Sequence, residues 1–159
     1  MSSNAENALA VLQEQIGKEE GPTDWLEITQ EQVNQFADAT HDHQFIHVDP
    51  ERAKDTPFGG AVAHGFLTLS LTAGMQMGMG GDVRHAQGMV MAVNYGLNKV
   101  RFINPVRVGK RIRLTRTLAG AELVANGTAV QTTHNVTIHI EGEEKPACVC
   151  ESLTRFVYA

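Results

Sequence analysis

Apolar residues recur at helical spacing in the first stretch of the chain. They are Leu9, Leu12 and Ile16. Their intervals of three and four predict an amphipathic helix from residue 5 to about residue 18. Gly21-Pro22 follows, a pair that ends helices. We therefore interpret residues 1–22 as an N-terminal helical extension of the domain that comes after.

A second helix is predicted just after a short strand. Residues 25–28 form an apolar run that we interpret as the strand, and Thr29 follows as the N-cap of the helix. Gln32 stands three residues on, where its side chain can reach back and complete a capping box. The helix is expected to stop near Thr40. Asp49-Pro50 marks the start of a further helix, with a capping carboxylate followed by proline at the first helical position.

Residues 61–79 are apolar on every side at helical spacing. The segment contains His64 and Gln76 and lacks aromatic or basic flanks, so it is not expected to span a membrane. A helix that is apolar all round must be enclosed by other structure, and a curved sheet is the simplest enclosure. The run Gly78-Met79-Gly80-Gly81 is expected to end this helix.

From residue 88 onward the apolar positions alternate, as they do in strands. The alternation changes parity beside Gly96, which predicts a β-bulge in a long first strand. Asn126-Gly127 predicts a hairpin between the next two strands. The first strand carries Met89, Met91, Val93, Tyr95, Leu97, Val100 and Phe102; the second spans 111–124; the third carries Val130, Val136, Ile138 and Ile140; the fourth spans 147–158. Helices followed by a meander of four antiparallel strands predict an α+β fold, with a long sheet curved around the apolar helix.

Length and composition indicate one ordinary globular domain. The chain has 159 residues, of which 42% are hydrophobic and 19% charged. Its net charge of −5 and the lack of a basic stripe argue against nucleic acid as a partner. Basic residues cluster between 99 and 116, either as the solvent side of two strands or as contacts for the phosphates of a carrier. The start shows no signal peptide, and Cys148 and Cys150 fit buried free thiols, so we expect a cytoplasmic protein.

Four residues suited to acid–base or metal chemistry lie close together. They are His41, Asp42, His43 and His47. Three interpretations are open: a polar loop with exposed histidines, a metal site, or a general acid–base centre in which a carboxylate and an imidazole share one water. The recognisable metal spacings, such as two histidines four apart on a helix, are missing, so we expect no metal. Acid–base catalysis needs groups that titrate near the working pH, a condition that partial burial can create.

At these residues the sequence resembles the MaoC-like family, which includes (R)-specific enoyl-thioester hydratases and the nodulation protein N group. The likeness covers about residues 25–158 and is carried by three runs. They are Asp42-His43-Gln44-Phe45-Ile46-His47-Val48-Asp49-Pro50, then Pro57-Phe58-Gly59-Gly60 with Ala63-His64-Gly65-Phe66-Leu67, and Val100-Arg101-Phe102 with Pro105-Val106. The common motif of the family is Gly-Asp-x-Asn-Pro-x-His. Gln44 and Phe45 depart from it in a way similar to the nodulation protein N branch.

The resemblance implies a hot-dog fold, usually dimeric, that binds an acyl thioester where two subunits meet. It also implies reversible syn addition of water to a trans-2-enoyl thioester, giving a (3R)-hydroxyacyl product. Asp42 and His47 match the catalytic pair, and Gly65 matches the glycine whose N–H faces the thioester carbonyl. A developing enolate oxygen needs such a fixed donor, which a helix N-terminus supplies. Ser70 corresponds to a serine that supports the aspartate in some relatives, and His64 is a candidate for packing at the helix start or for contact with substrate.

The resulting hypothesis is a homodimeric (R)-specific enoyl-CoA or enoyl-ACP hydratase that uses no metal or other cofactor. Two alternatives remain open. One is a hot-dog acyl-thioesterase, in which a carboxylate activates water against the thioester carbonyl. The other is an acyl-thioester-binding protein without turnover. Acyl chain length and carrier depend on pocket depth and surface detail, which the sequence does not reveal.

Overall fold

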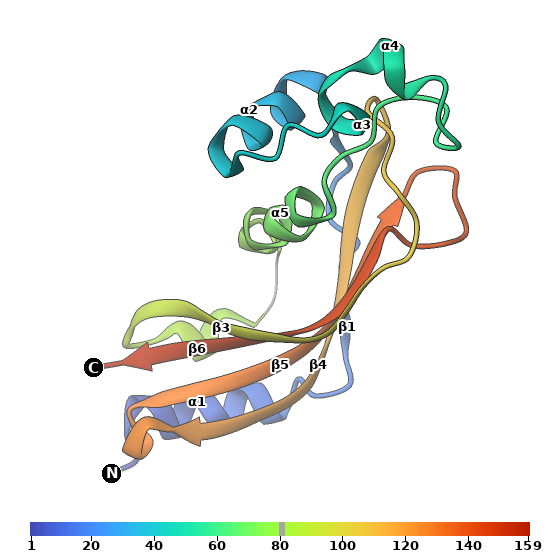
Figure 1. Cartoon of the computed structure of the whole chain (residues 1–159). Coiled ribbons are helices and arrows are strands. Elements are labelled where there is room, and N and C mark those ends of the chain that lie inside the picture. Colours follow the sequence, from blue (N-terminus) through green and yellow to red (C-terminus); the bar gives the residue numbers. More distant parts are fainter. Residues whose placement is uncertain (80–81) are drawn as a thin grey trace.

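The computed structural model describes residues 1–79 and 82–159. Its main feature is one antiparallel sheet, shown in Figure 1, with the long strands β3 (Met89–Phe102), β4 (Arg111–Val124), β5 (Ala129–Ile140) and β6 (Cys148–Tyr158). The short strands β1 (Glu19–Glu20) and β2 (Leu26–Glu27) both pair with β4. The order across the sheet is β1-β4-β5-β6-β3, so β3 lies at a free edge of the described chain.

The predicted meander is wrong for its first strand. β3 pairs with β6 and not with β4, the strand that follows it in sequence. The connection between β3 and β4 does not form a tight hairpin, because its backbone is bonded elsewhere. Ile103 N–H donates to Ala147 O at 2.9 Å, and Val108 N–H donates to Ala61 O at 2.9 Å. These bonds carry the chain across the end of the sheet before β4, β5 and β6 follow as consecutive neighbours.

Other strand predictions are confirmed. Strand β4 has the predicted bounds. The residues predicted for the buried face of β5 are all buried, namely Val130, Val136, Ile138 and Ile140. A register shift between Asn94 and Gly96 is the predicted bulge in β3. The hairpin between β4 and β5 turns at Asn126, whose φ of 53° is a left-handed conformation that asparagine tolerates.

The helices are α1 (Asn4–Gln13), α2 (Gln30–Thr40), α3 (Phe45–Val48), α4 (Pro50–Ala53) and α5 (Gly65–Met77), with 3-10 turns at Val83–Ala86 and Ala125–Gly127. Helix α1 lies across the outer face of the sheet (Figure 1). It ends at Gln13, before the predicted residue 18, and the chain then turns at Gly17, where φ is 85°. The N–H of Gly17 then donates to Leu118 O of β4 at 2.9 Å, which fastens the chain to the sheet.

Side-chain caps start α2 and α4. Thr29 accepts Gln32 N–H at 3.2 Å, as predicted. Gln32 does not return the bond: among the described residues its Oε1 is buried without a partner, so the capping box is only half formed. Asp49 caps α4 as predicted and accepts Arg52 N–H at 3.1 Å.

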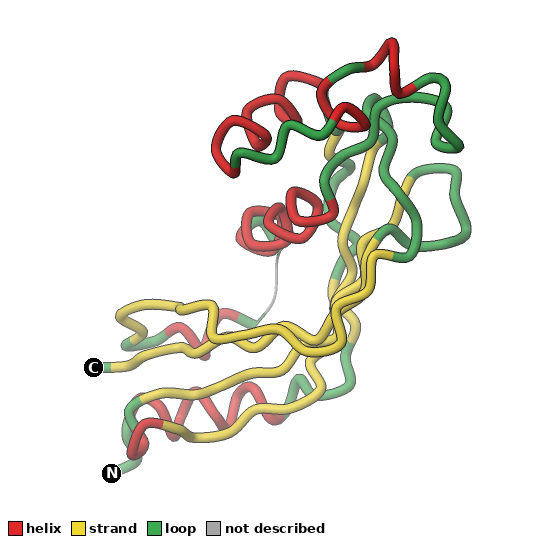
Figure 2. Tube along the Cα trace, in the orientation of Figure 1, coloured by secondary structure: helices red, strands yellow, loops and turns green. Residues whose placement is uncertain are grey.

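The predicted apolar helix begins later than its pattern indicates. Helix α5 starts at Gly65, and residues 61–63 run extended beside residues 106–108, to which main-chain hydrogen bonds join them. Figure 2 shows this connection as loop between α4 and α5. In the extended segment, main-chain N–H and C=O groups form hydrogen bonds with residues 106–108, so they do not require the hydrogen bonds of a helix. Gly80 and Gly81 of the predicted helix end lie outside the described residues.

The sheet curves around α5 from one side, as Figures 1 and 2 show. Leu67 and Thr68 of α5 are buried, whereas Phe66 is 68% exposed and Met77 is 88% exposed. The curved sheet around a central helix is thus confirmed. Within the described part of one chain, however, the helix is enclosed on one side only.

The main core lies between α5, α2 and the sheet. Its fully buried residues include Ile28, Val33, Ile112, Leu114 and Ile138. Cys148 and Cys150 belong to the same core as free, buried thiols, which confirms the prediction. Among the described residues, no helix has the length and apolar character that crossing a membrane requires.

Candidate active site

Asp42 lies in the loop between α2 and α3, and His47 lies in α3. Helix α2 ends at Thr40, and His41 adopts a left-handed conformation with φ of 63°, which directs the chain out of the helix. Asp42 follows in an exposed loop, where its carboxylate accepts Gln44 N–H at 3.3 Å. His47 falls within the single turn of α3, and its side chain is buried.

The His47 ring is held in one orientation. Its Nδ1–H donates to Val62 O at 2.6 Å, and its main-chain O accepts an N–H of the Gln30 amide at 2.7 Å. Because a carbonyl oxygen only accepts, Nδ1 carries hydrogen and Nε2 of the neutral ring carries a lone pair. Burial lowers the pKa of His47, while the bond to Val62 and the nearby Asp42 carboxylate oppose this effect. The ring is therefore neutral near pH 7 and has one basic nitrogen available.

His64 joins the same cluster from the residue just before α5. It is 3% exposed, and its Nε2–H donates to the main-chain O of Asp42 at 2.9 Å. Its ring stacks on that of His47 with centroids 3.8 Å apart and planes inclined by 23°. One side-chain donor atom from each of Asp42, His47 and His64 lies within 4.8 Å of the other two. The structure thus brings together three of the residues that the sequence analysis selected.

This set of one carboxylate and two imidazoles is chemically able to hold a metal ion, but its geometry does not fit one. A ligating nitrogen directs its lone pair in the plane of the ring, and a bound ion must lie in that plane at about 2.0–2.1 Å. Two stacked, nearly parallel rings do not share such a point. The stack of His47 on His64 must break before both bind one ion.

A cavity of about 260 Å³ brings His47 and Gly65 together. Gly65 is the first residue of α5, so its N–H has no acceptor within the helix and lies at the positive end of the helix dipole. Much of the remaining lining is apolar and includes Phe58, Phe102 and Val106. The cavity therefore combines a neutral imidazole, a helix N-terminus and a surface suited to an acyl group.

Gly65 also has a packing role. A Cβ at this position would lie 3.0 Å from Phe102 Cδ1, closer than side chains tolerate without movement. The sequence analysis did not select Phe102 or its neighbour in the cavity lining, Asn104. Their signal in the sequence was the run Val100-Arg101-Phe102, which carries part of the family likeness: Phe102 ends this run and Asn104 follows two residues later.

The structure does not place Ser70 beside Asp42. Ser70 is exposed, and its Oγ–H donates to Phe66 O, one turn earlier in α5, at 2.6 Å. It lines a separate cavity of about 280 Å³ between α5 and the sheet, together with Asn94 and Tyr95. Its role as a support for the aspartate remains a prediction.

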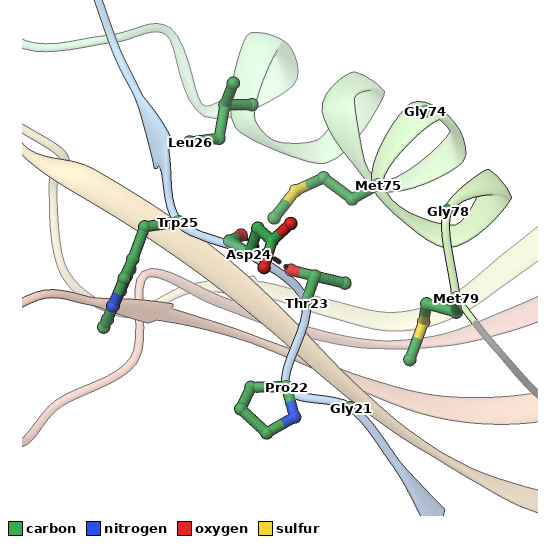
Figure 3. A pocket seen from close by; sticks show the side chains of 10 residues that line it. All are labelled: Gly21, Pro22, Thr23, Asp24, Trp25, Leu26, Gly74, Met75, Gly78 and Met79. Atoms are coloured by element: carbon green, nitrogen blue, oxygen red, sulfur yellow. Dashed lines mark hydrogen bonds between the residues drawn. The ribbon is translucent and has the colours of Figure 1, made fainter.

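A larger cavity, of about 440 Å³, lies on another side of α5. Figure 3 shows it between residues 21–26 and the last turns of the helix, with Met75 and Met79 pointing toward the segment 21–26. It shares no lining residue with the cavity of His47. Its titratable lining is Asp24, without an imidazole, whereas the smaller cavity contains His47.

Four of the seven basic residues between 99 and 116 pair with acids, two of which lie on strands β1 and β6. Lys99 approaches Glu151 to 3.2 Å, and Arg116 Nε donates to Glu20 at 2.5 Å. These pairs favour the interpretation that the residues form the solvent side of the sheet. Arg107 instead donates to Gly59 O at 3.0 Å, close to the segment that leads into α5.

The comparison with protein families decides the relationship. The family model of the MaoC-like domain matches residues 11–139, a range that contains the whole cluster. The chain belongs to the MaoC-like dehydratase family. It is 53% identical over 150 residues to 3-hydroxyacyl-thioester dehydratase Z of Mycobacterium tuberculosis, covering 94% of this chain and 96% of that protein. It is 43% identical over 150 residues to nodulation protein N of Rhizobium leguminosarum, covering 94% and 91%.

Solved structures of low sequence identity share the fold of this MaoC-like chain. A monoamine oxidase regulatory protein from Archaeoglobus superposes with a TM-score of 0.74 at 24% identity, over 91% of this chain and 92% of that one. The (R)-hydratase from A. caviae superposes with a TM-score of 0.65 at 22% identity, over 87% and 94%. These likenesses confirm the hot-dog fold.

The MaoC-like chain accommodates its unusual Gln44 and Phe45. Gln44 occupies the N-cap position of α3, and the Phe45 ring lies against the Arg52 guanidinium, whose carbon is 4.2 Å from the ring centroid. Asp42 and His47 still approach within 4.8 Å. The two departures from the common motif therefore leave the acid–base pair assembled.

Proposed function

We propose that this protein is an (R)-specific enoyl-thioester hydratase, which in reverse dehydrates (3R)-hydroxyacyl thioesters. The observation that carries the proposal is the convergence of Asp42 and His47 within 4.8 Å, together with the opening of His47 and Gly65 into one cavity. The 53% identity to a 3-hydroxyacyl-thioester dehydratase supports the same reaction.

In the proposed mechanism one water lies between the Asp42 carboxylate and His47 Nε2. The pair removes a proton from this water as its oxygen attacks C3 of the enoyl thioester. The thioester oxygen then carries the enolate charge, and the Gly65 N–H at the positive end of α5 stabilises it. The pair returns a proton to C2 on the same face, which completes a syn addition.

A homodimer acting on CoA or ACP thioesters in the cytoplasm is part of the proposal. The free edge strand β3 and one side of α5 expose large apolar side chains. They are Phe66, Met77, Val90, Met91, Val93, Tyr95 and Leu97. A second copy of the chain suits this surface, because it would cover the half of α5 that the first sheet leaves open. The buried thiols Cys148 and Cys150 are consistent with a reducing compartment.

A spectrophotometric assay with trans-2-enoyl-CoA substrates of increasing chain length tests the proposal. Hydration removes the enoyl absorbance without releasing thiol, and chiral analysis should identify the (3R) product. Release of free CoA without loss of the enoyl group would instead identify a thioesterase. Tight binding without either change would identify an acyl-thioester-binding protein.

A further inference from the structure

His64 contacts every part of the proposed site without opening into its cavity. Its Nε2–H donates to Asp42 O, and its ring stacks on His47. As the N-cap residue of α5 it directly precedes Gly65, and its main-chain O accepts Thr68 N–H at 3.2 Å. The residue therefore links the carboxylate loop, the imidazole and the helix N-terminus.

We propose that His64 is a positioning residue, which holds the Asp42 carboxylate and the His47 ring at their working separation. This inference rests on the proposed hydratase function and assigns His64 no contact with substrate. Asp42 lies in an exposed loop after the left-handed His41. The bond from His64 ties that loop to the buried core.

The stack fixes the second member of the pair. The bond from Nδ1 to Val62 O holds one ring atom of His47, and the stacked ring of His64 holds the plane of the ring. The centroids of the two stacked rings are 3.8 Å apart. Phe36 also packs against the His64 ring, with centroids 4.9 Å apart and planes inclined by 56°, and His64 is buried.

The hydrogen bond uses Nε2 of His64 as a donor. Nδ1 of the same ring is buried without a hydrogen-bond partner among the described residues. The titratable groups that face His47 are Asp42 and His64, and its main-chain partners, Val62 and Gln30, are uncharged. A positive charge on His47 is disfavoured beside His64, which supports the lowering of the His47 pKa by burial.

Two substitutions separate the two contacts. His64→Phe keeps a flat ring for the stack and removes the donor to Asp42. His64→Gln keeps an N–H donor at similar reach and removes the ring. We expect His64→Phe to lower kcat with crotonyl-CoA about 30- to 100-fold with KM changed less than about threefold, because a catalytic group displaced by about 1 Å loses that much rate. His64→Gln should retain more of kcat than His64→Phe.

The pH profile adds a second readout, in which a control variant separates loss of packing from loss of the imidazole. Both substitutions remove the imidazole beside His47, so the acidic limb of kcat/KM should move to higher pH. Phe36→Leu is the matched control: it trims packing on the same His64 ring, touches neither Asp42 nor His47 in the contacts above, and should leave the limb in place. Thermal unfolding of each variant reports its stability.

The outcomes are distinguishable. If the wild-type chain does not hydrate enoyl thioesters, the proposed function fails. If the wild type turns over and His64→Phe keeps near-normal kcat and an unmoved acidic limb, the positioning role is wrong. Equal losses in Phe36→Leu and His64→Phe would also overturn it, in favour of packing alone. If His64→Phe does not fold, the acidic limb of His64→Gln decides: a limb at the wild-type pH contradicts the inference.

Discussion

Burial and main-chain bonds determine the properties of single histidines in this protein. His47 is buried with its Nδ1 on a carbonyl, so it presents a neutral, basic Nε2 to the cavity. His43, four residues earlier, is exposed and pairs with Asp38 at 2.8 Å. Two histidines of one short segment thus have different chemistry, because α3 turns one inward and the loop leaves the other in solvent.

Asp42→Asn and His47→Gln should each lower the turnover of crotonyl-CoA by at least about 100-fold, because each removes one proton-transfer group. The fold should persist, since Asp42 is exposed and Asn can still accept the bond from Gln44. Circular dichroism and the enoyl-absorbance assay check both expectations. His43→Gln, in the same loop, is the control and should retain activity. Near-normal turnover in both site variants would refute the assignment.

A buried histidine remote from the site, His134 on β5, should make stability depend on pH. Burial, followed by the charges of Arg116 and His85, lowers its pKa to about 4. The unfolded chain binds a proton near pH 6.5 and the folded chain does not, so stability is fully present above this pH and is lost as pH falls toward 4. We expect the contribution of His134 to fall by about 2 kcal/mol between pH 7 and pH 5.

Urea unfolding of the wild type and of His134→Gln at both pH values measures this effect. The substitution removes the titrating group, so the free energy of unfolding of the variant should change less between pH 7 and pH 5. An equal pH dependence in both chains would show that other groups are responsible.

At the scale of elements, the connection between β3 and β4 has the largest consequence. It pairs with residues 61–63, and this pairing shortens α5 at its start and brings Gly65 to the helix N-terminus. The same connection carries β4 away from β3, so that β6 becomes the partner of β3. A single segment therefore sets both the sheet order and the position of the proposed oxyanion donor.

Gly109, where this connection enters β4, should not tolerate a side chain. Its φ is 92°, a conformation that L-residues rarely adopt, and its N–H donates to Ile28 O at 2.7 Å. A Cβ there meets no atom within 4 Å, so Gly109→Ala should cost backbone strain alone, about 1–2 kcal/mol of unfolding free energy. Thermal or urea unfolding checks the value.

Gly120 on β4 provides the matched control, because its Cβ would also meet open space and its φ lies outside the left-handed range. We expect Gly120→Ala to change stability by less than about 1 kcal/mol. Equal losses at the two positions would exclude backbone strain as the cause.

At the scale of the molecule, the single chain leaves a large apolar surface on β3 and α5 exposed to solvent. Phe66 and Met77 on the helix and Val93 in the middle of the edge strand are all exposed. Contiguous apolar patches on one face mark interaction sites, and an edge strand adds unpaired backbone groups to the same face. Oligomeric state and activity are therefore expected to be coupled.

Val93→Asp should shift the protein from dimer to monomer in sedimentation experiments, because it places a charge in the proposed interface. Hydratase activity should fall with the dimer. Val83→Glu, at an exposed valine outside β3 and α5, should leave both unchanged. A wild-type chain that sediments as a monomer while fully active would contradict the proposed dimer.

Local patterns in the chain were enough to establish the individual elements and the residue types of the site. The helical interval of Leu9 and Leu12, the alternation along β5 and the caps Thr29 and Asp49 depend on neighbours a few residues apart, so they can be recognised in the sequence. Asp42 and His47 are five residues apart, so their proximity is also local, and together with the family resemblance it indicated acid–base chemistry.

Only the tertiary structure decided the sheet order, the start of α5 and the contacts of His64. Residues distant in sequence make these features: Ile103 bonds Ala147, and residues 61–63 pair with residues 106–108. His64 reaches Asp42 across 22 positions. Such contacts depend on which strand edge and which ring face are available in the folded chain. The local periodicity of the sequence does not contain this information.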